Sequence, residues 1–304
     1  MQKAFDLYKN LIKTAKNYNC YYEECATLAP YTTMKIGGKC DILVKPNSEE
    51  SLLSLLKICK KENLPYRILG MGSNVLISDK GLSCAVIVLG KDMAEISVEN
   101  NIITAQAGAK LISVCKKALQ SSLTGLEFAY GIPGSVGGAL FMNAGAYGGE
   151  IKDIISHCNY IEKGELKTMK AEEMQLSYRK SYFSLNNACI TSVSFKLKKG
   201  DYNTIQSRMN ELMQRRIDKQ PLEYPSAGST FKRPVGDYAS RLIEVCGLKG
   251  EACGGAEVST KHSGFVINKN NATFDDVLDV VNCVKQKVNE QTGIKLECEM
   301  LIWE

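Results

Sequence analysis

The sequence predicts an α+β protein that consists of two main parts. Segments with helical periodicity alternate irregularly with short apolar strands, whereas a regular βαβ alternation would favour a parallel α/β sheet. No fixed-period repeat indicates a solenoid or a propeller. The 304 residues, 44% of them apolar and 23% charged, suffice for more than one packed core. We therefore place the main boundary near residue 200, with a further division near residue 90.

The helix that starts at Asn47 is the best-defined element of the first 200 residues. Asn47 is an expected N-cap, Glu50 stands at the matching capping-box position, and leucines recur at helical spacing before Pro65 bounds the helix. Between two expected strands, Gly70 to Asn74 is too rich in glycine for regular structure. The other elements expected in this region are helices at 5–18 and 110–120 and strands at 66–69, 84–89, 159–170 and 188–198.

A helix with signals at both ends is expected near the C-terminus. Thr273 is an N-cap residue, valines follow at helical spacing, and Gly293 is a typical C-terminal signal. Before it lie a loop rich in Pro, Gly and Ser at 221–234 and a second glycine-rich stretch at 247–264. The remaining expected elements are helices at 203–219 and 238–246 and a final strand at 295–303.

Charge and cysteine content exclude several classes of function. The net charge of +5 is small and the basic residues are spread along the sequence, so no nucleic-acid partner is expected. The longest strongly apolar run, residues 84–89, is far shorter than a bilayer span, so neither a membrane helix nor a signal peptide is expected. The 12 cysteines are scattered without a CxxC pair and the chain has 2 histidines, so no metal site is expected. We expect reduced cysteines, mostly in the core.

Two glycine-rich loops are the first indication of a ligand site. The loop at 131–138 alternates glycines with small residues, so its backbone can approach an anion closely and direct N–H groups toward it. Neither loop has the Walker spacing, and Gly70-Met-Gly72 lacks the third glycine of the Rossmann fingerprint. Tight turns would explain one such loop alone. Two loops, with the polar groups of Ser73, Asn74 and Ser135, indicate a large diphosphate cofactor held from two sides.

A series of short blocks follows in one order along the chain. They are Thr33-Met-Lys-Ile-Gly-Gly38, Gly70-Met-Gly-Ser-Asn-Val-Leu76, Gly131-Ile-Pro-Gly-Ser-Val-Gly-Gly-Ala139, Phe141-Met-Asn-Ala-Gly-Ala-Tyr147, Tyr178-Arg-Lys-Ser181, Gln220-Pro221, Ala227-Gly-Ser-Thr-Phe-Lys232 and Leu296-Glu-Cys-Glu299. In this set and order the sequence resembles the UDP-N-acetylenolpyruvoylglucosamine reductase family over nearly its whole length.

The resemblance implies an FAD-binding region at residues 1–200, of the vanillyl-alcohol-oxidase (PCMH) type, with subdomains at about 1–90 and 91–200. It also implies a C-terminal α+β domain, residues 201–304, that binds a UDP-sugar. The implied reaction reduces UDP-N-acetylglucosamine enolpyruvate to UDP-N-acetylmuramate, with NADPH as electron donor, for peptidoglycan synthesis. The C-terminal part lacks the inserted substrate-closing loop of longer members, so the chain is placed in the shorter class. A cytoplasmic monomer is expected.

The resemblance also assigns cofactor-binding positions in the two glycine-rich loops. They are Gly70, Met71, Gly72, Ser73, Asn74, Val75, Leu76, Gly131, Ile132, Pro133, Gly134, Ser135, Gly137, Gly138 and Ala139.

Three residues are carried over as catalytic: Arg179, Ser229 and Glu299. Hydride addition to C3 of the enol ether leaves negative charge at C2, delocalised into the adjacent carboxylate. The Arg179 guanidinium suits that charge because it stays protonated and offers a rigid fork to a carboxylate. Ser229 would donate the proton to C2, with help from Lys232 or water. Glu299, protonated or paired with a cation, would polarise or orient the carboxylate. Without the blocks, each residue has a simpler structural interpretation: Arg179 as an exposed arginine after a strand, Ser229 as a turn residue beside glycine, and Glu299 as a solvent-facing glutamate at a strand edge.

The expected substrate-binding residues are Tyr178, Arg216 and Lys232. Arg216 is favoured over the adjacent Arg215 as the partner of a carboxylate or phosphate, with the register left open. His262 is interpreted as a structural residue or as part of the substrate cleft.

Two other functions fit part of the sequence. A flavin oxidase or dehydrogenase acting on an alcohol would share the fold, but it often carries a histidine or cysteine near the loops for covalent flavin attachment, and no histidine precedes His157. A non-catalytic nucleotide-binding module would keep the loops without needing Arg179, Ser229 and Glu299 together. The reductase is therefore the favoured function.

Overall fold

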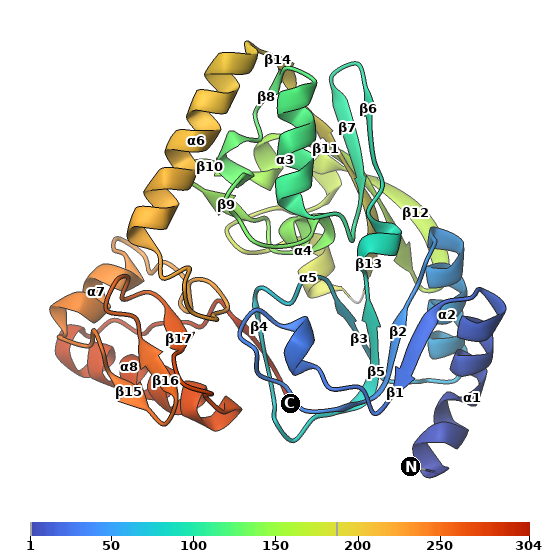
Figure 1. Ribbon diagram of the computed structural model, residues 1–304, viewed down its shortest axis with the longest axis horizontal. Helices are drawn as coiled ribbons and strands as arrows, with labels where there is room; N and C mark the ends of the chain where they lie inside the picture. Colours follow the sequence, from blue (N-terminus) through green and yellow to red (C-terminus); the bar gives the residue numbers. More distant parts are fainter. Residues whose placement is uncertain (1, 187) are drawn as a thin grey trace. The chain divides into compact units, whose positions relative to one another are not determined.

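The computed structural model describes residues 2–186 and 188–304 (Figure 1). The chain forms two compact units, each built from stretches that are far apart in sequence. Unit 1 contains residues up to 25, residues 41–71 and residues 83–215; unit 2 contains residues 26–40, 72–82 and 216–304. Because each unit combines separate stretches of the chain, the units do not test a division of the sequence near residues 90 and 200. These two boundaries stay predictions.

The first sheet of unit 1 has four strands in the order β1-β2-β5-β3. β1 and β2 are antiparallel, whereas β3 and β5 are parallel. Two helices, α1 and α2, pack side by side next to this sheet (Figure 1), and α2 buries Leu52, Leu55 and Leu56. The bounds are α1 Gln2–Asn17, β1 Tyr21–Glu24, β2 Cys40–Lys45, α2 Glu49–Lys61, β3 Tyr66–Leu69 and β5 Leu82–Val88.

The predicted N-cap of α2 was wrong by one residue. Ser48 is the N-cap: its hydroxyl accepts a hydrogen bond from the Ser51 N–H at 3.1 Å, and the Ser51 hydroxyl accepts one from the Ser48 N–H at 3.1 Å. The Asn47 side chain instead donates to the Tyr18 carbonyl at 2.7 Å. Both residue types make good N-caps, so the contact of Asn47 with the residue after α1 decided between them.

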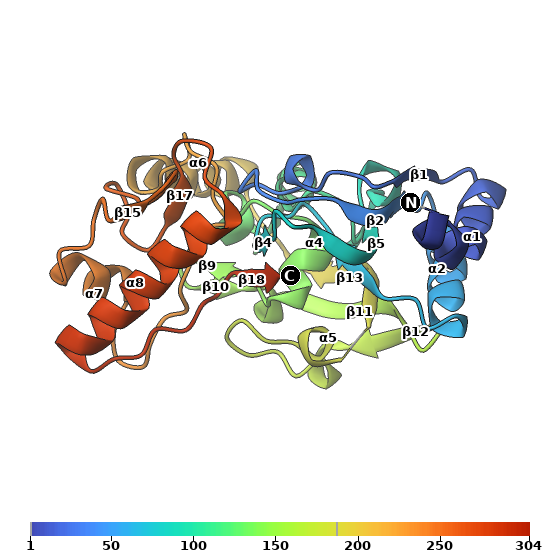
Figure 2. The ribbon, with the colours of Figure 1, turned by 90° about the horizontal axis from the view of Figure 1, so that it is seen from below.

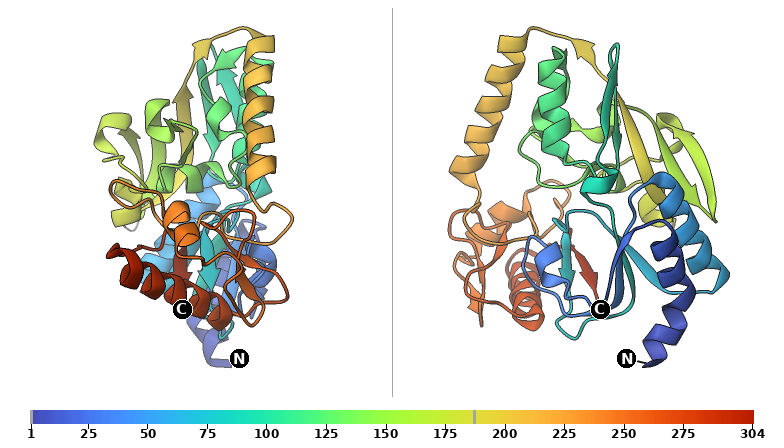
Figure 3. Two further views of the ribbon diagram at one scale, coloured as in Figure 1. Left: turned by 90° about the vertical axis from the view of Figure 1, so that its left-hand side faces the viewer. Right: turned by 45° about the vertical axis from the view of Figure 1, so that its right-hand side comes forward.

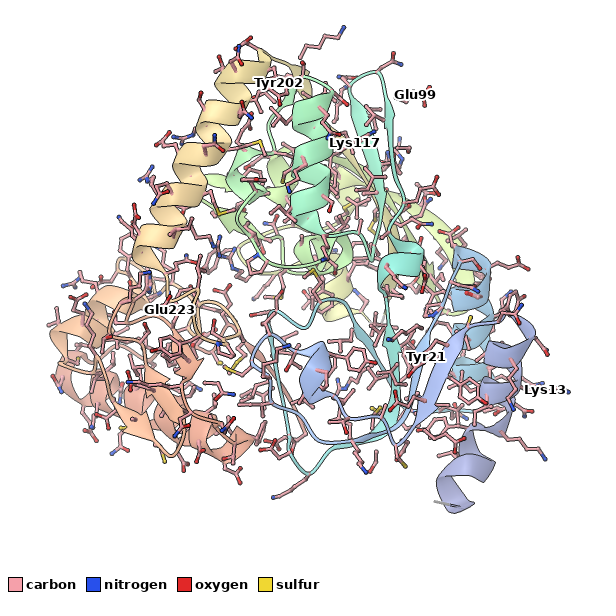
Figure 4. All side chains as sticks on the ribbon, in the orientation of Figure 1. Lys13, Tyr21, Glu99, Lys117, Tyr202 and Glu223 are labelled. Carbon is pink, nitrogen blue, oxygen red and sulfur yellow. The ribbon has the colours of Figure 1, made fainter. Side chains whose placement is uncertain are left out.

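The second sheet of unit 1 is antiparallel, with five strands in the order β12-β11-β13-β7-β6. α6 begins directly after the short strand β14 (Figure 3) and contributes Ile205 and Met209 to the core of unit 1. The bounds are β6 Ile96–Glu99, β7 Ile102–Gln106, α3 Leu111–Gln120, β8 Leu123–Thr124, α4 Val136–Phe141, β9 Gly145–Ala146, β10 Gly149–Glu150, β11 Ile155–Glu162, β12 Glu165–Lys170, α5 Tyr182–Leu185, β13 Cys189–Lys196, β14 Lys198–Lys199 and α6 Tyr202–Lys219. Figure 4 labels Tyr202, the exposed first residue of α6, and Lys13, an exposed residue of α1.

Unit 2 contains a three-stranded antiparallel sheet, β15-β16-β17, on which α8 packs (Figure 2). α8 buries Val277, Val281, Val284 and Val288, the valines whose spacing predicted it. β4 pairs in parallel with β18, the last strand of the chain. The bounds are β4 Val75–Ile77, α7 Ala239–Val245, β15 Ala252–Cys253, β16 Ala256–Val258, β17 Val266–Asn268, α8 Phe274–Thr292 and β18 Leu301–Trp303.

Two expectations for unit 2 need correction. The final strand is Leu301–Trp303 rather than residues 295–303, because residues 297–299 bond to residues 230–232 through an isolated bridge, Phe231 with Cys298, instead of a regular ladder. The glycine-rich loop at 70–74 does not lead straight to β5: a strand that the sequence analysis missed, β4, lies between them. β4 has three residues, too few for a clear alternation signal.

Most cysteines are small core residues, as expected. Those that are buried are Cys20, Cys40, Cys59, Cys84, Cys115, Cys158 and Cys189. Burial raises the pKa of the Cys84 thiol to about 11, despite the opposing charge of Arg67. Within residues 2–186 and 188–304 all cysteines are free thiols, no cluster of ligating side chains could hold a metal ion, and no helix has the length and apolarity needed to cross a bilayer.

Candidate active site

The two glycine-rich loops touch at Gly70, directly after β3. A methyl group on Gly70 would lie 2.2 Å from the Ser135 Oγ, well inside van der Waals contact. Ser135 is 3% exposed and caps α4, where its hydroxyl accepts from the Gly138 N–H at 3.3 Å. Only a residue without a side chain fits at position 70 while Ser135 holds this place.

Gly72 continues the first loop in a conformation that requires glycine. Its φ is +61°, and a Cβ there would lie 2.1 Å from the Tyr31 carbonyl oxygen. Gly72 is the first residue of a unit 2 segment. In that segment the Asn74 amide donates to the Glu299 carbonyl at 3.2 Å, and the Asn74 carbonyl accepts from the Leu301 N–H at 2.9 Å. Val75 and Leu76 lie in β4, 6% and 0% exposed, so their side chains belong to the core.

The second loop uses part of its backbone to hold itself in place. The N–H groups of Val136 and Gly137 donate to the carbonyls of Ala109 and Ala107 at 2.8 and 2.9 Å, and the Ala139 N–H donates to the Ser135 carbonyl at 2.9 Å. These N–H groups are therefore committed within the protein. Residues 131–134 are partly or fully exposed. The Ile132 N–H donates to the Ala129 carbonyl at 3.0 Å and Pro133 has no N–H, so an approach to an anion falls to the backbone of Gly131 and Gly134.

These loops fit the diphosphate of a dinucleotide cofactor. In unit 1, Gly70 lies against the second loop, and residues 131–134 present partly exposed backbone next to it. Gly134 has φ +152°, a conformation that L side chains rarely adopt, so the backbone there can be approached closely. The residues that would hold the cofactor in unit 1 are thus Gly70, Met71 and the loop from Gly131 to Ser135.

Arg179 lies in a two-residue turn of unit 1. Ser177 and Lys180 exchange both backbone hydrogen bonds at 3.1 Å, so Tyr178 and Arg179 form the turn, and Arg179 has φ +56°. The guanidinium lies 4.9 Å from the centre of the Tyr178 ring and donates to the Gly145 carbonyl at 3.4 Å. Tyr178 is 42% exposed. The predicted arginine therefore sits on a protruding turn with its aromatic neighbour against it.

Asn143 and Glu150, which are not among the predicted site residues, support this turn. The Asn143 amide donates to the Glu150 carboxylate at 2.9 Å and to the Ser177 carbonyl at 3.0 Å. Burial alone would raise the pKa of Glu150, but hydrogen bonds from Lys152 and Asn143, with the charges of Lys152 and Arg179, hold that pKa below its usual value. The signal that could have found Asn143 is its place inside the block Phe141-Met-Asn-Ala-Gly-Ala-Tyr147.

Ser229 is an exposed residue between buried neighbours in unit 2. Ala227 and Thr230 are 3% and 1% exposed, and Gly228, with φ +75°, turns the chain between them. Thr230 is anchored on several sides: its N–H donates to the Gly264 carbonyl at 2.9 Å and its hydroxyl accepts from the Val266 N–H at 3.0 Å. The Ser229 hydroxyl is thus presented from a fixed backbone.

The structure brings Glu299 beside Ser229 within unit 2. The Glu299 N–H donates to the carbonyl of Thr230, the residue after Ser229, at 2.8 Å. Asn74 holds the Glu299 carbonyl from the other side. Two of the three residues predicted to be catalytic therefore come from adjacent segments of one unit, and the third, Arg179, belongs to unit 1.

The predicted substrate residues differ in their surroundings. The Lys232 ammonium pairs with the Glu297 carboxylate at 3.0 Å, which holds it along the 297–299 segment. Arg216 is 9% exposed, whereas Arg215 pairs with the exposed Glu211 carboxylate at 3.5 Å. The two arginines therefore differ in burial, and the choice of Arg216 over Arg215 as a substrate-binding residue stays a prediction.

His262 has a structural contact in unit 2. Its Nδ1 accepts from the Gly264 N–H at 3.2 Å, and its ring packs edge to face with the Phe265 ring, with the two ring centres 5.0 Å apart. Burial lowers the pKa of His262 and so favours the neutral ring, and the hydrogen bond that Nδ1 accepts is compatible with the tautomer that carries its proton on Nε2. Because Gly264 in turn binds Thr230, His262 supports the backbone beside Ser229.

Comparison with known proteins shows which families the two ends of the chain match. The family model of an FAD binding domain matches residues 40–167, and that of the UDP-N-acetylenolpyruvoylglucosamine reductase C-terminal domain matches residues 220–303. The UDP-N-acetylenolpyruvoylglucosamine reductase of Clostridium novyi (strain NT) is 50% identical over 273 residues, which cover 90% of this chain and 89% of that protein. That of Geobacillus kaustophilus (strain HTA426) is 46% identical over 303 residues, 99% of each chain.

A solved structure supports the fold over the same length. The crystal structure of UDP-N-acetylenolpyruvylglucosamine reductase from Thermus caldophilus matches with a TM-score of 0.82 and 34% identity, over 94% of this chain and 100% of that one. The predicted α+β fold, which combines an FAD-binding domain with the C-terminal domain of this reductase family, is therefore confirmed.

Proposed function

The chain belongs to the UDP-N-acetylenolpyruvoylglucosamine reductase family, and from this we propose how its own residues carry out the reaction. It is an FAD-dependent oxidoreductase of peptidoglycan precursor synthesis. The proposed reaction reduces UDP-N-acetylglucosamine enolpyruvate to UDP-N-acetylmuramate with NADPH as electron donor. When bound, FAD supplies the hydride that adds to C3 of the enolpyruvyl group.

The main task of the protein is to stabilise the charge that develops on the substrate. Arg179, on its exposed turn, pairs with the substrate carboxylate, into which the C2 charge is delocalised. A charged fork preorganised in this way is worth about 3 to 4 kcal/mol in the transition state. Glu299 orients the same carboxylate through a shared proton. Tyr178, Arg216 and Lys232 bind the rest of the substrate, with Arg216 favoured for a phosphate because it is buried.

Ser229 delivers the proton to C2. The observation that carries this role is its position: an exposed hydroxyl on a backbone fixed by Thr230, in the segment directly bonded to that of Glu299. A serine hydroxyl is a weak acid, so its developing alkoxide needs stabilisation. Lys232 pairs with Glu297 at 3.0 Å, which leaves a water relay as the simpler source of that help.

The proposal extends to the environment of the enzyme. Reduced cysteines buried in the core suit the cytoplasm, and we propose that the enzyme acts there as a monomer of the shorter class, without an inserted substrate-closing loop.

The test is the substitution Ser229→Ala in purified protein. A yellow protein whose NADPH oxidation depends on UDP-N-acetylglucosamine enolpyruvate supports the reductase. In Ser229→Ala, flavin reduction by NADPH should persist, while reduction of the substrate should fall about 10²- to 10⁴-fold, the usual contribution of a positioned general acid. Ser207→Ala, at an exposed position of α6, is the control and should behave as the unaltered protein.

Other outcomes would redirect the assignment. A yellow protein that oxidises alcohols would point to the alternative flavin oxidase, and a colourless protein that binds nucleotide without turnover would point to a binding module. Full substrate turnover in Ser229→Ala would remove Ser229 from the mechanism while leaving the reductase in place.

A further inference from the structure

Asn143 is a buried polar residue with all its side-chain groups in use. It is 0% exposed and has φ +42°, a left-handed conformation that asparagine tolerates. Its amide nitrogen donates to the Glu150 carboxylate at 2.9 Å and to the Ser177 carbonyl at 3.0 Å, and its Oδ1 accepts from the Lys152 N–H at 2.9 Å. The three hydrogen bonds of this buried side chain are costly to lose, because each loss leaves a polar partner unsatisfied.

The turn that carries Arg179 is fastened at both ends to the segment around Asn143. Before the turn, Ser177 accepts the hydrogen bond from Asn143. After it, the buried Ser181 hydroxyl donates to the Phe141 carbonyl at 2.7 Å. Both fastening points lie within 141–143, so this short segment determines where the turn stands.

Asn143 also holds the carboxylate of the hairpin that Arg179 contacts. It shares the Glu150 carboxylate with the Lys152 ammonium, which lies 2.9 Å away. Glu150 pairs in the β9–β10 hairpin with Gly145, whose carbonyl accepts from the Arg179 guanidinium. Burial opposes the ionised form of Glu150, but hydrogen bonds from Lys152 and Asn143 lower its pKa, and the charges of Lys152 and, least of all, Arg179 act in the same direction.

We propose that Asn143 is a positioning residue for Arg179 in substrate reduction. By holding Ser177 and Glu150 together, it sets the place and direction of the guanidinium, while it need not touch the substrate itself. The inference rests on the proposed role of Arg179. It adds Asn143 as the residue of unit 1 that holds the arginine in place. A displacement of a catalytic group by about 1 Å can cost about 10²-fold in rate.

The experiment is a double-mutant cycle between Asn143 and Arg179 in the full-length, flavin-loaded enzyme. Asn143→Gly suits the positive φ and removes all three side-chain hydrogen bonds. Asn143→Asp keeps the size of the side chain and an oxygen that accepts from the Lys152 N–H, but it loses the amide N–H groups that donate to Glu150 and Ser177. It is the second variant, to be used if Asn143→Gly does not fold. The measurement is kcat/KM for UDP-N-acetylglucosamine enolpyruvate, with flavin content and circular dichroism as readouts of folding.

We expect Asn143→Gly or Asn143→Asp to lower kcat/KM about 10²-fold with flavin content retained. In the Arg179→Ala background the same change should have little further effect, because a residue that acts only through Arg179 has nothing left to position. Asn101→Ala is the matched control: Asn101 also donates from its amide to a carbonyl of unit 1, that of Leu197 at 3.0 Å, and the variant should keep full kcat/KM.

Three results would overturn the inference, and they separate it from the proposed function. Independent losses that multiply in the double variant would show that Asn143 acts generally on the fold. Unchanged kcat/KM in folded Asn143→Asp would show that the turn needs no such support. If Arg179→Ala alone leaves substrate reduction intact, Arg179 has no role in the reaction, and the positioning role of Asn143 is then excluded as well.

Discussion

Single residues decide how closely the loops of the site approach each other and how its charged groups are held. Gly70 leaves room for the Ser135 hydroxyl, Gly72 leaves room for the Tyr31 carbonyl, and Asn143 joins the segments around Arg179. Such contacts depend on tenths of an ångström, because closely packed interiors have no space for an additional methyl group. Substitutions at these positions therefore test the site directly.

The first prediction concerns Gly70→Ala. The new methyl group would lie 2.2 Å from the Ser135 Oγ, so either the Ser135 hydroxyl must leave its place or the loops must shift, and overpacking of this kind costs about 1 to 3 kcal/mol. We expect FAD to bind more weakly by about that amount, measured by the visible absorbance of bound flavin during titration. Adding Ser135→Ala, which removes the closest atom, should restore part of the affinity.

The control for this prediction is Gly90→Ala. A methyl group at Gly90 meets no atom within 4 Å, so FAD affinity should not change. Equal affinity of the Gly70→Ala and unaltered proteins would show that FAD does not depend on the contact between the two loops.

At the level of whole elements, end signals and periodicity determined α8 but not every helix start. Thr273 accepts from the Asp276 N–H at 3.1 Å, the Asp276 carboxylate accepts from the Thr273 N–H at 2.9 Å, and Gly293 ends the helix with φ +73°. These are the predicted limits of α8, and they are confirmed. The start of α2 differed by one residue because Asn47 and Ser48 are both good caps, and only the contact with Tyr18 separates them.

The second prediction concerns the cap of α8. Thr273→Ala removes the acceptor for the Asp276 N–H, and loss of such a cap costs about 1 kcal/mol. We expect the free energy of unfolding to fall by about that amount in urea titrations. The chain has a single tryptophan, Trp303, which is buried in unit 2. Its fluorescence therefore reports the unfolding of this unit.

Thr260→Ala is the matched control, since Thr260 is exposed and outside α8. It should unfold as the unaltered protein does. A Thr273→Ala variant of unchanged stability would mean that the hydrogen bond from the Asp276 carboxylate to the Thr273 N–H is enough to start the helix.

The whole molecule is organised by contacts between distant parts of the chain. Residues 26–40 and 72–82 belong to unit 2 together with residues 216–304. Met34, Ile36 and Leu76 lie in the same hydrophobic core as the buried face of α8, and β4 is the partner of β18. The C-terminal part therefore depends on two N-terminal segments for its core and for the pairing of its last strand.

The third prediction follows from this arrangement: a fragment of residues 216–304 should not fold alone. Without Met34, Ile36 and Leu76 its core is incomplete, and β18 has lost β4. Circular dichroism should show no cooperative thermal transition for the fragment. Mixing it with a fragment of residues 1–215 should restore a transition. A cooperative transition of the fragment alone would instead support residues 201–304 as an independent domain.

Local pattern determined much of this protein: the α+β class, β3, α3, α6, α7 and α8, and the small residues of the two glycine-rich loops. Family blocks pointed to Arg179, Ser229 and Glu299 as candidates for catalysis. Local sequence carries such features because caps, periodicity and glycine conformations are properties of neighbouring residues. Tertiary structure alone decided the pairing of β4 with β18 and the short final strand. It also decided three contacts of the site: that of Gly70 with Ser135, the hydrogen bond from the Glu299 N–H to the Thr230 carbonyl, and that from Asn143 to Ser177 in the turn of Arg179. These features join residues far apart in sequence, and their partners exist only once the chain has folded.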